Sequence, residues 1–303
     1  MITTLQKKTA QAIINIFETG QVLGDYGNVT VIPGDTGHLS YGRSQVTLAS
    51  KNLYRLIKAY CENVGARYSN ALVPYLPRIE QPDLSLDNDE AFKSLLSEIS
   101  IDPVMQNAQD EYLDIHFWDP SVKAATVHRI TTSLGIAVFY DGNIQGSLKK
   151  ISNKTNDKYG VSSDIGEQAW IKDYVNVRRD WLANNSNSAL HSTVYRMDAL
   201  NELIESDKWD LALPLSVRGV NIDEDSLNGV YQRLLKLTSS PMRGDDVKEI
   251  QQALINRGYN ITADGVFGQD TKVAVIDFQK QNGLSPDGKV GNSTRNKLLS
   301  TLT

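Results

Sequence analysis

The chain has 303 residues, 40% of them hydrophobic and 22% charged, which is typical of globular proteins and excludes a disordered chain or a coiled coil. Its formal net charge is −5 and its sequence shows no basic stripe of the kind that binds phosphates, so no nucleic-acid partner is expected. At roughly 100–200 residues per domain, two domains are expected. Cys61 is the single cysteine, so no intramolecular disulfide can form.

The N-terminal segment MITTLQKKTAQAIINIFETG lacks the cationic and apolar regions of a secretory signal. No stretch approaches the ~18 apolar residues of a membrane-spanning helix, so no membrane span is expected. We therefore expect synthesis in the cytoplasm without a Sec signal.

Residues 4–19 carry the pattern of an amphipathic helix. Thr3 and Gln6 have capping-box spacing, and apolar residues recur at helical intervals from Ala10 to Phe17. Gly20 is a typical helix stop. Residues 21–47 mix β-branched residues with turn formers and favour a short β-hairpin.

Further segments up to about residue 235 show helical spacing, which predicts a mainly α domain with one small β region. These segments are 50–64, 89–99, 121–146, 164–183, 193–206 and 226–237.

An internal repeat marks the C-terminal part of the chain. The pattern D-G-x-x-G-x-x-T occurs at 264–271 and again 23 residues later, at 287–294. Each copy predicts a tight turn that leads into a helix, and three such short helices can close a small core. The motif residues are Asp264, Gly265, Thr271, Asp287, Gly288 and Thr294. We predict a domain at 1–236, a linker at 237–243 and a second domain at 244–303.

Glu18 and Asp35 are a candidate pair for glycosidic hydrolysis, which needs one carboxylic acid and one carboxylate. Glu18 follows Phe17 at the end of the first helix, where apolar neighbours and the helix dipole would disfavour its ionised form. Asp35 lies in the turn PGDTGHLSYG, whose backbone N–H groups and hydroxyls could keep it ionised. Position alone also fits two ordinary solvated residues.

Other chemistries find less support. His38, His116, His128 and His191 show no metal-ligand spacing, so no metal and no cofactor are expected. Cys61 lies on a helical pattern and is interpreted as a core or partly exposed helix residue. The tryptophans, at 118, 170, 181 and 209, have helical neighbours that favour core packing over sugar stacking.

Residues 242–303, with the repeat and the segment RGDDVKEIQQALINRGY, resemble a peptidoglycan-binding domain of bacterial wall hydrolases. About residues 5–210 resemble the chitosanase family of the lysozyme-like superfamily. The segments that carry this resemblance are IFETG, YGNV, GDTGHLSYGRSQ, FWDPSVKAA, LGIAVFYDGNIQG, VRRDWL and VYRMDAL. The resemblance implies a lysozyme-like α+β fold beside a three-helix wall-binding domain.

That resemblance also implies roles for individual residues. Glu18 would be the general acid and Asp35 the base of an inverting reaction, with Ser40 helping to hold the attacking water. Substrate contacts are implied for Tyr26, His38, Tyr41, Arg43 and Asp141, and a buried charge network for Asp141 with Arg178, Arg179 and Arg196. The interval from acid to base is about one residue shorter than in the family, and either His38 or Arg43 could be its basic loop residue.

The wall-binding domain favours peptidoglycan as substrate, because tethering raises the local enzyme concentration. Chitosan hydrolysis is the alternative, and a catalytically inactive wall-binding protein is a third possibility. If peptidoglycan is the substrate, we expect the protein to be a monomer. As an endolysin it would reach the wall after release by a holin. As an antibacterial effector it would be exported by a specialised secretion system and paired with a cognate immunity protein.

Overall fold

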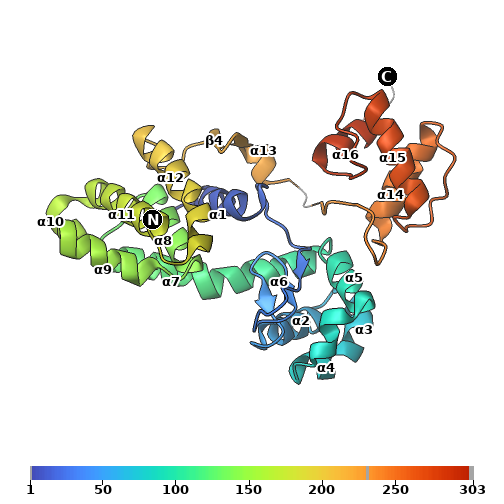
Figure 1. The fold of residues 1–303 in the computed structure, drawn as a ribbon, viewed down its shortest axis with the longest axis horizontal. Coiled ribbons are helices and arrows are strands. Elements are labelled where there is room, and N and C mark those ends of the chain that lie inside the picture. The colour runs from blue at the N-terminus through green and yellow to red at the C-terminus, as the bar shows by residue number, and fades with distance from the viewer. Residues whose placement is uncertain (1, 230–231, 300–303) are drawn as a thin grey trace. The chain divides into compact units, whose positions relative to one another are not determined.

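The computed structural model describes residues 2–229 and 232–299 (Figure 1). These residues divide into two compact units. The described residues of 1–24 and 111–229 form unit 1, and those of 25–110 and 230–303 form unit 2. The fold is mostly helical with a few short strands, which confirms the predicted fold class. No helix among the described residues is long and apolar enough to cross a membrane.

Unit 1 is built almost entirely from helices, with one two-stranded antiparallel ribbon. Its elements are α1 (Thr4–Thr19), the π-helical segment η3 (Asp114–Trp118), α7 (Asp119–Val127), α8 (Ser133–Ile144), α9 (Leu148–Tyr159), α10 (Ser162–Ile165), α11 (Glu167–Ala183), η4 (Ser188–Thr193), α12 (Tyr195–Glu205), β4 (Leu215–Val217), β5 (Val220–Ile222) and α13 (Glu224–Leu227).

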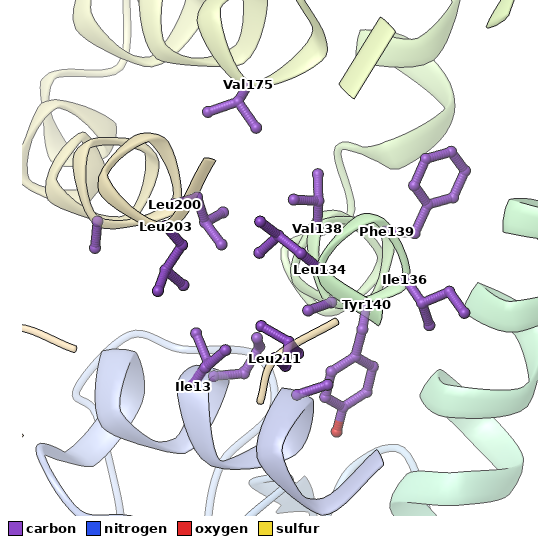
Figure 2. Close-up of a cluster of buried hydrophobic side chains, with 14 of the residues drawn as sticks. Ile13, Leu134, Ile136, Val138, Phe139, Tyr140, Val175, Leu200, Leu203 and Leu211 are labelled. Atoms are coloured by element: carbon purple, nitrogen blue, oxygen red, sulfur yellow. The ribbon is translucent and has the colours of Figure 1, made fainter. Parts of the chain in front are cut away.

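Helix α8 is the centre of this unit. Every residue from Ser133 to Gly142 is buried, as expected of a helix that is apolar on all sides. Figure 2 shows its side chains pointing outward all round, with Ile13 of α1, Val175 of α11 and Leu200 of α12 packed about them. This central helix brings Asp141 into the protein interior.

Helix α1 has the predicted bounds, and its local signals work as expected. Thr3 and Gln6 form the capping box. Gly20 ends the helix at φ 73°, and its N–H donates to Ile16 O over 3.0 Å. This left-handed conformation is the one that glycine adopts without strain. Glu18 is thereby fixed in the last turn of the helix.

The first part of unit 2 surrounds a small antiparallel sheet of strand order β1-β2-β3. Its elements are β1 (Val29–Thr30), β2 (Ser40–Tyr41), β3 (Val46–Thr47), α2 (Asn52–Cys61), α3 (Ser69–Leu72), η1 (Val73–Tyr75), α4 (Leu76–Glu80), η2 (Leu84–Asn88), α5 (Glu90–Ile99) and α6 (Pro103–Leu113), within which the unit boundary falls. The predicted hairpin is thus a three-stranded sheet of two-residue strands. Residues 31–39 connect β1 to β2 and carry Asp35.

The C-terminal part of unit 2 contains the three predicted short helices, which are α14 (Asp245–Asn256), α15 (Gln269–Gln281) and α16 (Asn292–Leu299). Two buried glutamines organise the repeated turns. The Nε2 of Gln251 donates to Asp264 and Thr271, and its Oε1 accepts from Gly265 N over 2.8 Å.

Gln279 repeats these bonds in the second copy, with Asp287, Thr294 and Gly288. The six motif residues of the repeat therefore build the turns. Their sequence pattern reports on this small fold and does not single out atoms that contact a sugar.

The predicted helix at 226–237 and linker at 237–243 are wrong in part. Helix α13 ends at Leu227, and residues 230–231 of the prediction lie outside the described residues. Leu235 pairs with Val290 through two backbone hydrogen bonds, and Leu235 and Met242 are buried in the core of the C-terminal helices. The C-terminal fold thus begins before residue 237, because these apolar side chains complete its core.

Candidate active site

Glu18 is held by two polar side chains of unit 1. Its Oε1 lies 2.9 Å from Arg196 Nη1 and accepts a hydrogen bond of 3.0 Å from Gln145 Nε2. No contact to Oε2 is recorded among the described residues, so this oxygen is the one available to carry a proton. The Glu18 side chain is 41% exposed, which leaves it accessible to a substrate.

The apolar neighbour of Glu18 in the sequence is Phe17. Phe17 is buried, and its ring packs 5.0 Å from the Arg196 guanidinium instead of covering Glu18. The Arg196 guanidinium, which pairs with Oε1, fixes the orientation of the Glu18 carboxyl group.

Arg196 belongs to a buried charge network centred on Asp141. Asp141 is completely buried, and its Oδ2 accepts from Arg178 Nη1 over 2.5 Å while its Oδ1 accepts from Arg196. Burial alone would raise the pKa of Asp141, but the two guanidinium groups outweigh it and hold that pKa below its usual value. Two arginines and two carboxylates, counting Glu18, balance in charge.

Two expectations for this network need correction. Asp141 cannot contact a substrate, because it is inaccessible and both its oxygens bind arginines. Arg179 is not a member, because it pairs with Asp198 over 2.6 Å at the surface, where both side chains are more than 40% exposed. On α11 adjacent residues point in different directions, so Arg178 faces the core and Arg179 faces solvent.

Asp35 lies in the β1–β2 connection of unit 2 and is exposed. Its backbone N–H donates to Ile32 O over 3.0 Å, and its carbonyl accepts from His38 N over 3.4 Å, so it begins a turn. Glu18 belongs to unit 1 and Asp35 to unit 2. Exposure leaves the Asp35 carboxylate accessible to water and substrate.

Two expected site residues follow Asp35 in the same segment. His38 Nδ1 lies 2.7 Å from Asp87 Oδ2, and the His38 side chain is 32% exposed. Ser40 begins β2, and its hydroxyl donates to His38 O over 3.3 Å. That hydroxyl oxygen keeps its capacity to accept a hydrogen bond from water.

Tyr26, Tyr41 and Arg43 are not placed to contact a substrate, because none of these side chains is more than 7% exposed. Tyr41 lies in the central strand and is fully buried. The Arg43 guanidinium packs 4.9 Å from the ring of Tyr26, and both side chains bind Asp110. The Asp110 side chain, at 44% exposed, is the accessible member of this group.

Sequence reasoning missed the residues that hold the expected ones. Gln145 lies four residues after Asp141, a helical spacing that could have placed it near Glu18. Asp87 and Asp110 carry no comparable local signal, because they reach their partners across 49 and 67 residues of sequence. The tryptophans behave as expected: Trp118 and Trp170 are buried, while Trp181 and Trp209 pack against the core.

Two protein-family models match separate parts of this chain. The model of glycosyl hydrolase family 46 matches residues 12–215, and that of a peptidoglycan binding domain matches residues 243–298. A chitosanase of Bacillus subtilis (strain 168) is 28% identical over 232 residues, which cover 70% of this chain and 82% of that protein.

Solved chitosanase structures are also similar to this chain. A family 46 chitosanase of Gynuella sunshinyii in complex with chitotetraose is 25% identical with a TM-score of 0.61, covering 73% of this chain and 98% of that one. A mutant chitosanase from Bacillus subtilis MY002 complexed with 6 GlcN is 26% identical with a TM-score of 0.62, covering 72% and 96%.

Proposed function

Because this chain belongs to glycosyl hydrolase family 46, we propose that it is a glycoside hydrolase whose substrate is chitosan, a β-1,4-linked glucosamine polymer. The observation that carries the proposal is the carboxyl group of Glu18, oriented by Arg196 in a fold similar to chitosanases solved with glucosamine oligomers. Chitosan thereby replaces peptidoglycan as the preferred substrate.

In the proposed reaction, Glu18 donates its proton from Oε2 to the glycosidic oxygen as the bond from that oxygen to the anomeric carbon breaks. Asp35 takes a proton from a water whose oxygen bonds to the anomeric carbon from the opposite face. The product therefore has inverted configuration. Ser40 would accept a hydrogen bond from that water, and the buried Asp141 network keeps Glu18 in place through Arg196.

Peptidoglycan is a second candidate because residues 243–298 match a peptidoglycan binding domain. Such a domain concentrates the enzyme on a wall without any new catalytic contact. It therefore supports a polysaccharide partner more directly than it supports the identity of the bond that is cleaved. Release by a holin or a specialised secretion system would give access to the wall.

The test is digestion of soluble chitosan and purified peptidoglycan by the full chain, with mass spectrometry of the products and a Glu18→Gln variant as blank. We expect glucosamine oligomers from chitosan that are missing from the blank. Fragments with reducing-end muramic acid, without chitosan products, would establish the second candidate instead. Products from neither polymer would contradict a hydrolase and favour a wall-binding protein.

A further inference from the structure

The carboxylate of Asp87 bridges two groups of the segment that carries Asp35. Its Oδ2 lies 2.7 Å from His38 Nδ1, and its Oδ1 accepts a hydrogen bond of 2.9 Å from Leu39 N. Asp87 comes from η2, far from this segment in sequence, and its side chain is only 14% exposed. Hydrogen bonds to a charged carboxylate with little exposure to water are stronger than ordinary surface contacts.

The segment needs such an anchor because its backbone is not in a relaxed conformation. His38 has φ 58°, a left-handed conformation that is uncommon outside glycine. At the preceding position Gly37 packs so closely that a Cβ atom would lie 2.9 Å from Thr47 Cγ2 and 3.2 Å from Asp35 Oδ2. The Asp35 carboxylate therefore lies close to the backbone of Gly37.

The contacts of Asp87 affect both Asp35 and Ser40, which would bind the attacking water in the proposed reaction. Asp35 and His38 close one turn, since His38 N donates to the Asp35 carbonyl. Ser40 bonds to the carbonyl of His38. A shift of the His38 backbone would consequently move the proposed base and the water-holding hydroxyl together.

We propose that Asp87 is a positioning residue, which acts through His38 and Leu39 to hold Asp35 and Ser40 in the geometry that activates water. The inference rests on the proposed function for its kinetic consequence. His38 serves as the donor that joins the turn to Asp87, and its own contact with substrate is not required. Nδ1 therefore carries a proton in this pair, and Nε2 is the ring nitrogen left for solvent or substrate.

Four variants test the anchor by the kinetics of glucosamine hexamer hydrolysis. Asp87→Ala removes both bonds, and we expect kcat to fall by about tenfold to a hundredfold while KM changes less than about twofold, because only the water-activating step is misplaced. His38→Gly removes the ring without backbone strain and should lower kcat similarly. His38→Asn keeps a donor near Nδ1 and a residue that tolerates φ > 0, so it should retain most of kcat.

Asp83→Ala is the matched control, since Asp83 caps the same short helix and pairs with Arg78 without contacting the Asp35 segment. We expect it to leave kcat nearly unchanged. The inference is overturned if Asp87→Ala keeps full kcat, if Asp83→Ala lowers kcat as much, or if His38→Asn is as impaired as His38→Gly.

A readout that does not need activity separates this inference from the proposed substrate. Amide hydrogen exchange of Leu39, whose N–H is bonded to Asp87, should be faster in Asp87→Ala than in the wild type and unchanged in Asp83→Ala. Equal protection of Leu39 in all three proteins would contradict the anchor. If Leu39 exchanges faster in Asp87→Ala but the wild type leaves glucosamine hexamer intact, the proposed substrate is refuted. The role of Asp87 in holding the segment is then still supported.

Discussion

A Glu18→Gln variant is expected to lose about a thousandfold in kcat on chitosan, because general acid catalysis contributes roughly a hundredfold to ten-thousandfold. Glutamine keeps an oxygen that can accept from Arg196 and Gln145, so the position of the side chain is preserved while its transferable proton is lost. KM should therefore change little, since the variant removes an interaction made in the transition state. Release of reducing ends from soluble chitosan measures the effect.

Glu205→Gln is the control for this variant. Glu205 is also exposed in the last turn of a helix, α12, and we expect the variant to keep wild-type kcat. Glu18→Gln should lose less stability than Asp141→Ala, because Glu18 is 41% exposed and Arg196 keeps Asp141 as its partner. If it retains more than about a tenth of wild-type kcat, Glu18 is not the general acid of the proposed inverting hydrolysis.

The second large effect concerns stability. Asp141→Ala leaves Arg178 and Arg196 buried without their central counterion, and removing one member of such a network costs about 3–5 kcal/mol. The control is Asp198→Ala, which breaks the exposed pair with Arg179 and should cost at most about 1 kcal/mol. Denaturant unfolding of the full chain measures both losses. Equal losses in the two variants would contradict a structural role for the buried network.

The pH dependence of this difference follows from the lowered pKa of Asp141. An aspartate whose pKa is lowered in the folded state binds fewer protons there than in the unfolded chain. Its contribution to the free energy of unfolding therefore rises with pH until the pH passes the pKa of the unfolded chain, about 3.9. The stability gap between wild type and Asp141→Ala should thus stay constant from pH 8 to about pH 5. It should shrink only as the pH falls further, and a gap that closes between pH 8 and pH 6 would contradict the assignment.

Local sequence signals predicted the parts of the fold that local interactions determine. The capping box at Thr3 and the left-handed Gly20 set both ends of α1, and therefore the position of Glu18. The two D-G-x-x-G-x-x-T copies identified the turns of the C-terminal helices, because each copy encodes one turn and the hydroxyl that bonds to its buried glutamine. Each of these features spans only a few residues.

The errors arose where distant residues decide the structure. Leu235 has a helical neighbourhood, but its pairing with Val290 makes it part of the C-terminal core. Arg43 and Tyr26 are buried and both bind Asp110, which neither position reveals alone. Asp87 was missed for the same reason. Partners of buried or anchored polar groups depend on tertiary packing, which local periodicity does not encode.

The proposed function depends on Glu18 and Asp35 acting as the acid and the base of an inverting hydrolysis of β-1,4-linked glucosamine. The most direct test is proton NMR of glucosamine hexamer during its first turnovers by the wild-type chain, before the anomers equilibrate. Attack by water opposite the leaving group predicts that the new reducing ends appear first as the α-anomer. New ends that appear first as the β-anomer, or a hexamer that stays intact, would contradict the account.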